Sequence, residues 1–361
     1  MKYIDEYRDK RLIKILADEI KKAAERREYR FMEVCGTHTM AIARFGLKAL
    51  LPPNVRLLSG PGCPVCVTPT SYIDKAISYS GLRDVVIATF GDMVNVPGSR
   101  SSLREVRSER GNVKIVYSAL DALGLAVKHP DKKIVFLGIG FETTAPTIAA
   151  AIKEAKKKRI KNFFVLCGHK VMPPALKALI SDRDVNLDGF ILPAHVSAII
   201  GSRPYGFISK SYKIPCVIAG FEPLDIMQGI YMLIRQVVKK DPIVEIQYDR
   251  VVRPTGNRLA QLLMKEVFKT ADSEWRGIGV IPASGLAIKK DFRSFNSEEN
   301  FKIRLPKRPR DKKGCICGEV LKGKRVPTDC RLFGKGCTPG HPVGPCMVSS
   351  EGACSAYFMY K

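Results

Sequence analysis

The cysteines of this sequence fall into two groups whose spacing could support chemistry. Three lie in the glycine-flanked segments CGTHT and GPGCPVC, at Cys35, Cys63 and Cys66. Six more follow residue 314, at Cys315, Cys317, Cys330, Cys337, Cys346 and Cys354. Because thiolates bind soft metals and exchange disulfides, each group indicates a metal centre, a redox pair or both. We therefore expect two sites of sulfur chemistry in one polypeptide.

The upstream group combines a CxxC unit with a cysteine that directly follows an expected strand. Cys63 and Cys66 form the unit CPVC, whose turn holds two sulfurs close enough to chelate one metal or to close a disulfide. Cys35 is followed by Gly36, which allows close backbone approach, and by His38. Three soft sulfurs favour iron, zinc or copper(I) over magnesium or calcium. His38 is either a further ligand or only a hydrogen-bonding partner.

The downstream cysteines have the spacing C-x-C-x12-C-x6-C-x8-C-x7-C. Six thiols exceed the four that a tetrahedral zinc ion or a [4Fe–4S] cluster requires, so four can ligate and two can remain for redox exchange. Zinc is the simpler alternative, but the sequence has neither paired CxxC knuckles nor a histidine at typical zinc spacing. The spacing and the soft ligands favour an iron–sulfur cluster.

Acids and imidazoles follow other expected strands. They are Asp92 in TFGDM, Glu142 in GFETT, His169 in CGHK, His195 in PAHVS and Glu222 in AGFEP. In open parallel sheets, ligands bind outside the carboxyl ends of the strands, so these side chains can orient metal ligands or relay protons. Each can instead cap the following helix. The candidate catalytic residues are Cys35, His38, Cys63, Cys66, Asp92 and Glu142.

The elements that must position these residues alternate along the chain. Short β-branched apolar runs, which indicate strands, occur at 31–34, 55–58, 84–89, 113–117, 133–138, 162–166, 188–192 and 215–219. Helical patterns lie between them, among them 69–80, 118–129, 144–159, 173–181 and 222–239. This alternation predicts an α/β fold with parallel sheets.

The expected strands divide into two sets of four with similar strand ends, which suggests an internal duplication, although local similarity of βα turns is the simpler explanation. We expect two similar parallel-sheet α/β domains, at 1–130 and 131–240, that face each other across a cleft. The C-terminal region, 241–361, carries a small cysteine-rich iron–sulfur domain. Before that domain we expect a strand at 243–252, a helix at 256–269, a strand at 277–281 and a linker or exposed arm at 291–314.

Composition limits the class of protein. With 361 residues, 45% of them hydrophobic, the chain can bury large cores. Its net charge of +25 would suit nucleic acid, but the basic residues are spread along the chain without a recognition motif, so we expect no nucleic-acid partner. No apolar run approaches the roughly 18 residues that span a membrane, and the start is charged. We expect a cytoplasmic protein without a membrane partner, where clustered cysteines serve as ligands or working thiols.

Six segments together resemble one protein family. They are CGTHT at 35–39, GPGCPVC at 60–66, TFGDM-x-x-VPG at 89–98, GFETTAP at 140–146, PAHVSAIIG at 193–201 and the ending that starts DCRLFGKGC at 329. From about residue 30 onward the sequence is similar to the HypD family of hydrogenase maturation factors. Asn95, where a basic residue is common in that family, is a minor departure.

The resemblance implies a scaffold on which the Fe(CN)2CO unit of [NiFe]-hydrogenases is assembled. A small chaperone, HypC, would share the iron with Cys35, and HypE would donate cyanide. The family fold has two α/β domains and a terminal [4Fe–4S] domain similar to that of ferredoxin:thioredoxin reductase. The implied cluster ligands are Cys315, Cys330, Cys337 and Cys354, and the implied redox pair is Cys317 with Cys346. Electrons would pass from the cluster to Cys63 and Cys66, which with Cys35 would hold the iron.

Two other functions would use some of the same residues. A thiol–disulfide reductase acting on a protein substrate would use the cluster and the CPVC pair but would not need Cys35 or an iron between them. A nucleic-acid-binding iron–sulfur protein is suggested by charge alone. The sequence does not decide whether the chain is an enzyme, because a redox-active scaffold for cofactor assembly has the same residue pattern.

Overall fold

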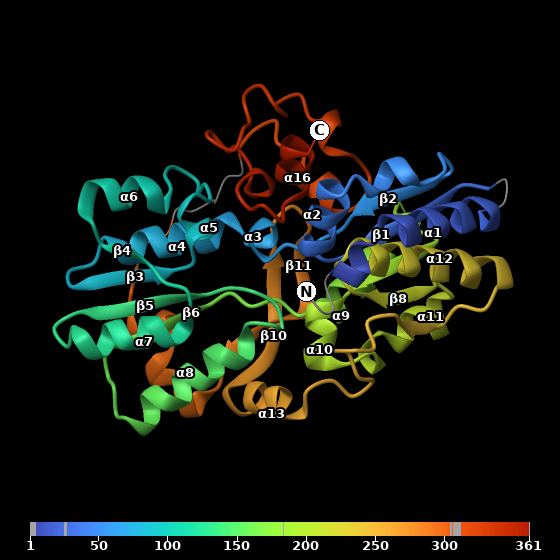
Figure 1. The fold of residues 1–361 in the computed structure, drawn as a ribbon. Helices are drawn as coiled ribbons and strands as arrows, with labels where there is room; N and C mark the ends of the chain where they lie inside the picture. Colours follow the sequence, from blue (N-terminus) through green and yellow to red (C-terminus); the bar gives the residue numbers. More distant parts are fainter. Residues whose placement is uncertain (1–4, 25–26, 183, 304, 306–311, 361) are drawn as a thin grey trace.

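The fold consists of a five-stranded parallel sheet, a four-stranded parallel sheet and an antiparallel hairpin (Figure 1). The computed structural model describes residues 5–24, 27–182, 184–303, 305 and 312–360. Each strand that the apolar runs predict up to residue 219 is present, with ends within two residues of the expected ones. The prediction of an α/β fold with parallel sheets is therefore confirmed.

The first four strands of each sheet follow the same order. Sheet A has the order β2-β1-β7-β8-β9, and sheet B has the order β4-β3-β5-β6, with parallel pairing throughout. The strands of sheet A are β1 (Tyr29–Glu33), β2 (Val55–Ser59), β7 (Gly189–Pro193), β8 (Cys216–Ala219) and β9 (Val244–Ile246). Those of sheet B are β3 (Val85–Thr89), β4 (Val113–Ile115), β5 (Lys133–Gly138) and β6 (Phe163–Cys167). In each sheet, the strand that comes first along the chain lies between the second and the third strands that the chain adds to that sheet.

The chain does not complete one sheet before it starts the other. It contributes β1 and β2 to sheet A, builds all of sheet B from β3 to β6, and then returns to sheet A with β7, β8 and β9. The expectation that residues 1–130 and 131–240 each supply one sheet is therefore wrong. An apolar run predicts a buried strand. Which other strands pair with that strand depends on tertiary packing, which the run does not encode.

Helices connect the strands. Those before β6 are α1 (Lys10–Ala23), α2 (Gly36–Arg44), α3 (Pro64–Val67), α4 (Thr70–Ser80), α5 (Gly91–Val94), α6 (Leu103–Arg110), α7 (Ala119–Lys128) and α8 (Ala145–Lys157). Those after it are α9 (Met172–Ile180), α10 (Ala194–Ile200), α11 (Gly206–Tyr212), α12 (Pro223–Lys239), α13 (Arg258–Val267), α14 (Ser297–Asn300), α15 (Cys317–Leu321) and α16 (Ala353–Met359). The 3-10 helices are η1 (Asp5–Arg8), η2 (Leu47–Leu50), η3 (Arg203–Tyr205), η4 (Lys290–Phe295), η5 (Pro327–Asp329) and η6 (Pro345–Met347).

Alternate residues of a strand pack into different cores, as the pleat of a sheet requires. On β1, Phe31 packs in a core with α1, α2 and α12, whereas Met32 belongs to a central core. The central core includes Leu192 of sheet A and Leu137 of sheet B, so the two sheets share one continuous apolar interior. A third core packs α7 and α8 on the other face of sheet B.

The segment after sheet A forms an antiparallel hairpin that the sequence predicted only in part. Its strands are β10 (Phe268–Trp275) and β11 (Gly279–Ile288). The helical pattern at 256–269 corresponds to α13, but β10 was not expected, because its alternation of apolar and polar residues is weak. The stretch from 291 to 303 is not an exposed arm: Phe292 and Phe295 are buried. Residues 304 and 306–311 of that expected linker lie outside the described residues.

The cysteine-rich residues 312–360, called here the terminal module, form short elements that cover one side of the molecule (red in Figure 1). Within it, α16 packs against α2, and η6 packs against α3. Both contacted helices begin directly after the upstream cysteines, at Cys35 and Cys63. The two groups of cysteines are therefore joined through packed secondary structure.

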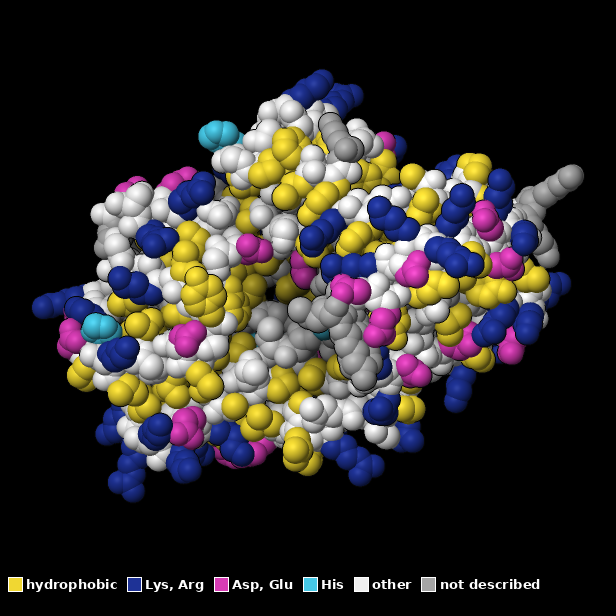
Figure 2. Space-filling model, viewed as in Figure 1, with side chains coloured by type: hydrophobic (Ala, Val, Ile, Leu, Met, Phe, Trp, Pro, Cys, Tyr) yellow, Lys and Arg dark blue, Asp and Glu magenta, His cyan; other side chains and the backbone are white. Residues whose placement is uncertain are grey.

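The distribution of surface charge bears on the expectation of no nucleic-acid partner, and the lengths of the helices bear on the expectation of no membrane partner. Figure 2 shows Lys and Arg side chains spread over the visible face, with Asp and Glu between them. Among the described residues, no helix combines the length and the apolar character that crossing a bilayer requires.

Candidate thiol site where the strand ends meet the terminal module

The strand order explains why candidate residues gather at particular strand ends. In an open parallel sheet, loops on either side of the first strand diverge and leave room for a ligand at this switch point. In sheet A the switch lies between β1 and β7, which lead into Cys35 and His195. In sheet B it lies between β3 and β5, which lead into Asp92 and Glu142.

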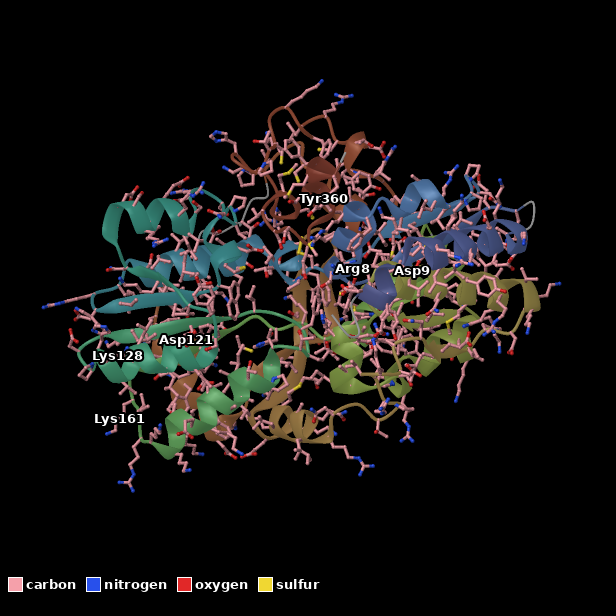
Figure 3. The ribbon with its side chains drawn as sticks, viewed as in Figure 1. Arg8, Asp9, Asp121, Lys128, Lys161 and Tyr360 are labelled. Carbon is pink, nitrogen blue, oxygen red and sulfur yellow. A yellow bond between two sulfur atoms is a disulfide. The ribbon has the colours of Figure 1, made fainter. Side chains whose placement is uncertain are left out.

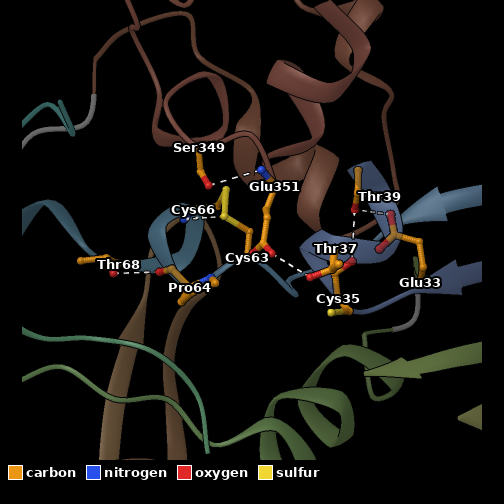
Figure 4. Close-up of a disulfide and its surroundings, with 10 residues drawn as sticks. All are labelled: Glu33, Cys35, Thr37, Thr39, Cys63, Pro64, Cys66, Thr68, Ser349 and Glu351. Carbon is orange, nitrogen blue, oxygen red and sulfur yellow. Dashed lines mark hydrogen bonds between the residues drawn. A yellow bond between two sulfur atoms is a disulfide. The ribbon is translucent and has the colours of Figure 1, made fainter. Parts of the chain in front are cut away.

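Cys63 and Cys66 form a disulfide, with a Cα–Cα separation of 5.2 Å (Figure 4). Pro64 starts the short helix α3, and the Cys63 sulfur accepts a hydrogen bond from the Cys66 backbone N–H at 3.2 Å. Both side chains are buried, with 3% and 0% of their surface exposed. Neither sulfur can act as a thiolate ligand in this state, so ligation would first require reduction of the disulfide.

Cys35 lies directly against the loop that carries this disulfide. A Cβ atom at Gly62 would be only 2.2 Å from the backbone nitrogen of Cys35, and the Gly36 N–H donates a hydrogen bond to the Gly62 carbonyl at 3.2 Å. No side chain fits at position 62 unless the backbone moves. The glycines in GPGCPVC and CGTHT therefore bring the two cysteine-bearing loops into backbone contact.

The Cys35 thiol is free and buried, at the N-terminus of α2. Burial raises its pKa to about 12, and the Glu351 carboxylate adds to this increase. The backbone N–H groups of Thr37 and His38 act in the opposite direction. The thiol is consequently protonated at neutral pH, and formation of a thiolate there requires a cation in contact with the sulfur.

Glu351 of the terminal module touches the CGTHT segment and was not anticipated from the sequence. Its Oε1 accepts a hydrogen bond from the Thr37 hydroxyl at 2.7 Å, and a Cβ on Gly36 would lie 2.6 Å from its own Cβ (Figure 4). Burial raises the pKa of Glu351, and the exposed carboxylate of Asp92 contributes to this increase. A single acid among the downstream cysteines gave no periodicity or spacing by which to single it out.

His38 is held by sheet A rather than by the cysteines. Its Nε2 lies 3.1 Å from the Ala219 carbonyl and 3.0 Å from the Gly220 carbonyl, and its ring packs on Phe221. Burial lowers its pKa to about 4, so the ring is neutral and Nε2 carries the donated proton. Only Nδ1, which has no hydrogen-bond partner among the described residues, is left as a potential ligand.

Glu142 joins the loop after β5 to the start of α9. Its Oε1 accepts a hydrogen bond from the Met172 backbone N–H at 3.0 Å, while its Oε2 has no partner within the part of the chain described. Burial raises its pKa to about 7, and the Met172 hydrogen bond opposes that change. Glu142 is therefore a buried carboxyl that titrates near neutrality.

The remaining strand-end candidates have structural partners. Burial lowers the pKa of His169 to about 3, and its Nδ1 lies 3.5 Å from the Cys167 sulfur. The ring of His195 packs on Phe221 with 4.1 Å between centroids. Glu222 accepts a hydrogen bond from the guanidinium of Arg8, with 3.0 Å between Nη2 and Oε1 (Arg8 is labelled in Figure 3). The contacts described for these three residues are with protein groups of the fold, and none of them joins a residue to the cysteines at 35, 63 and 66.

The terminal module brings its cysteines together. One pocket is lined by Cys315, Cys317, Cys330, Cys337, Cys346 and Cys354. A hydrogen bond with Cys317 raises the pKa of Cys315, so these two thiols are adjacent, and Cys317 also hydrogen-bonds to Cys346. A Cβ on Gly344 would lie 2.6 Å from the Cys315 sulfur, so only glycine leaves space at that wall of the pocket.

The donor set of this pocket is one that an iron–sulfur cluster can use. No group of three or more His, Cys, Asp or Glu side chains within the described ranges is arranged to hold one metal ion. The four thiolates of a [4Fe–4S] cluster bind four different irons and so stand further apart than the ligands of one ion. A pocket walled by six soft sulfurs and no carboxylate has the donor set that such a cluster uses.

The two sites share one interior. Cys63, Cys66, Cys317 and Cys346 all belong to the central core, and Cys315 and Cys354 pack against it. The packing of α3 on η6 puts the helix of the CPVC disulfide against the helix of Cys346. These elements therefore pack directly against each other.

Fold and site together define a class of protein: a two-sheet parallel α/β protein in which strand-end thiols adjoin a cysteine-rich module. Residues 11–361 match a family described as HypD, the hydrogenase formation hypA family. Relatives named hydrogenase maturation factor HypD include those of Cupriavidus necator (47% identity), Escherichia coli (44%) and Rhodobacter capsulatus (43%). Each alignment covers 100% of this chain and 97–98% of the relative. The chain belongs to the HypD family, and the resemblance inferred from its motifs is confirmed.

Proposed function

We propose that this chain is a redox-active scaffold for [NiFe]-hydrogenase maturation, on which an iron bearing cyanide and CO is assembled. Membership of the HypD family supports a role in hydrogenase maturation. The observation that carries the finer proposal is the packing of the terminal module on both α2 and α3, the helices that follow Cys35 and Cys63. That packing links a candidate electron source to the candidate iron ligands.

The Cys63–Cys66 disulfide must be opened before these sulfurs can hold the iron that the scaffold receives as cargo. Opening takes two electrons and two protons and yields two thiols. The dithiol of Cys317 and Cys346 can supply them by exchange, in which its own sulfurs are oxidised to a disulfide. A cluster held by Cys315, Cys330, Cys337 and Cys354 would supply single electrons to restore that dithiol, drawn from an external low-potential one-electron donor protein.

Cys35 is the proposed ligand that holds the iron throughout assembly. Its thiol loses its proton on binding ferrous iron, and the N–H groups at the start of α2 stabilise the resulting thiolate. A HypC-like chaperone would contribute a second thiolate, and a HypE-like partner would donate cyanide. Asp92 and Glu351 border the same place and give it an acidic rim.

The proposal is tested by infrared spectroscopy of the protein purified anaerobically with HypC-like and HypE-like partners. Cys35→Ala should lose the bands of metal-bound cyanide and CO, because the buried thiolate that holds the iron is missing, and should keep the absorbance of the terminal cluster. Cys216→Ala removes a thiol from β8 that is also buried and should keep both signals. Undiminished cyanide and CO bands in Cys35→Ala would rule out this role for Cys35.

A thiol–disulfide reductase acting on a protein substrate is the second candidate, favoured by the disulfide between Cys63 and Cys66. Both sulfurs are almost completely buried, so a protein substrate cannot reach them without rearrangement. This burial favours a disulfide that accepts electrons from within the molecule over a dithiol that reduces an external protein. The reductase would be supported instead if Cys35→Ala reduced protein disulfides at the rate of the unmodified chain.

A further inference from the structure

The tip of the β10–β11 hairpin is inserted between the segments that the proposed function connects. The Arg276 backbone N–H donates a hydrogen bond to the carbonyl of Val67, the last residue of α3, at 2.9 Å. Its Nη1 donates to the carbonyl of Pro97, in the loop after β3 and α5, at 3.3 Å. A Cβ on Gly277 would lie 2.5 Å from the Cα of Gly318 in the terminal module. One turn of backbone thus contacts the CPVC helix, a sheet B strand-end loop and the terminal module.

The position of this turn is fixed by the residue before it. Trp275 is fully buried, donates its Nε1–H to the Ser284 hydroxyl at 2.8 Å, and packs against Phe141 of GFETT with 5.9 Å between ring centroids. Gly277 has φ +74°, a conformation that a side chain strains. Arg276 is therefore held at a defined place rather than on a mobile loop.

The Arg276 side chain is buried against the downstream thiols. Only 4% of it is exposed, and it lines a pocket together with Cys315 and Cys317. Its positive charge lies close enough to act on the thiols of Cys315, Cys317 and Cys346. A guanidinium does not lose its proton in a protein, so this charge is permanent, and removal from water makes its field on the thiols stronger than that of a surface cation.

We propose that Arg276 is a positioning residue of the terminal module, whose buried guanidinium stabilises negative charge there and so raises the reduction potential of the cluster that the module would hold. The inference rests on the proposed function, because it presumes that cluster. One-electron reduction adds one negative charge to a cluster, and a fixed nearby cation favours the more negative state. Arg276 would thus keep the module reducible while the hairpin backbone holds it against α3.

The test is a redox titration of anaerobically purified protein with dithionite, followed by electron paramagnetic resonance. Arg276→Gln should lower the equilibrium constant for one-electron reduction about tenfold, which corresponds to about 59 mV. Arg276→Lys keeps the charge and should stay within about twofold of the unmodified protein. Lys312→Gln is the matched control, because Lys312 lines the same pocket but is exposed to water, which screens its charge.

The outcomes separate the inference from the proposed function. An unchanged potential in Arg276→Gln, with the cluster present, overturns the inference and leaves the proposed function intact. Stoichiometric zinc without sulfide in the unmodified protein overturns both. If Arg276→Gln fails to retain a cluster, Gly277→Ala decides. Its Cβ would push the hairpin tip away from Gly318 and carry the unchanged Arg276 guanidinium away from the thiols, so the potential should fall. A potential equal to that of the unmodified protein in Gly277→Ala would also overturn the inference.

Discussion

Burial sets the protonation of three of the candidate residues. The pKa of Cys35 is raised to about 12, and those of His38 and His169 are lowered to about 4 and about 3, in each case mainly by burial. At neutral pH all three are uncharged. Binding of an iron cargo would therefore release a proton from Cys35, and the affinity for the metal should rise with pH.

Glu142 provides a measurable consequence of the same effect in the absence of metal. Its pKa in the folded protein is about 7, above its ordinary value of 4.5, so the folded state binds the proton more tightly than the unfolded chain does. Proton binding at Glu142 therefore stabilises the folded state, and this contribution is fully present below about pH 4.5. It is lost as the pH rises to about 7, which lowers the free energy of unfolding by roughly 3 kcal/mol in total. The protein should become less stable over this interval as far as Glu142 is concerned.

Glu142→Gln isolates this contribution, because the amide retains an acceptor for the Met172 N–H but does not titrate. Urea unfolding of both proteins between pH 4.5 and 8 should give a difference in unfolding free energy that changes across the interval and levels off above about pH 7. A constant difference would contradict a raised pKa at this position.

At the scale of elements, the candidate site depends on two loops that touch through their backbones. The loop after β2 brings Gly62 against Cys35, and the loop after β1 brings Gly36 against Glu351. Helix α3 then packs on η6, and α2 packs on α16. These short elements have few internal hydrogen bonds, so their geometry is determined by the contacts between them.

Gly62→Ala should disrupt this arrangement, because its Cβ would overlap the Cys35 backbone. We expect a loss of about 3 kcal/mol in unfolding free energy, measured by urea denaturation. Gly91→Ala is the matched control: Gly91 also follows a strand, but a Cβ there meets nothing within 4 Å, and the change should stay within about 0.5 kcal/mol. Equal stability of the two variants would argue against the backbone contact.

At the scale of the whole molecule, the return of the chain to sheet A brings distant strand ends together. Cys35 follows β1, Asp92 follows β3, and both approach Glu351 near the C-terminus. The terminal module thus joins the strand-end loops of both sheets. The proposed electron route between the module and the CPVC disulfide would depend on this assembly and not on either part alone.

Cys346→Ala tests this route. The variant should retain the cluster absorbance, because Cys346 is not a proposed ligand, while Cys63 and Cys66 should stay oxidised after addition of a reduced one-electron donor protein. Thiol labelling after denaturation, read by mass spectrometry, measures this directly. Cys354→Ala removes a proposed ligand and should instead lose the absorbance. Labelling of Cys63 and Cys66 at the level of the unmodified protein in Cys346→Ala would exclude Cys346 from the route.

The amino-acid sequence by itself determined much of the local structure and the family of the chain. Strands such as 133–138 and helices such as 222–239 were predictable because apolar periodicity directly reflects burial. The CPVC pair was predictable as a close thiol pair, because a CxxC turn constrains both sulfurs over four residues. Family membership followed from the motifs, since they are short, specific and contiguous.

Only the tertiary structure decided which strands are neighbours and which distant residues meet. The pairing of β1 with β7 depends on packing between segments more than 150 residues apart, and no local pattern encodes it. Glu351 and Arg276 acquire their roles through contacts with Thr37, Val67 and the downstream thiols. Local patterns report the burial of a residue, whereas its partners result from the free energy of the whole fold, which is why these two residues could not be singled out beforehand.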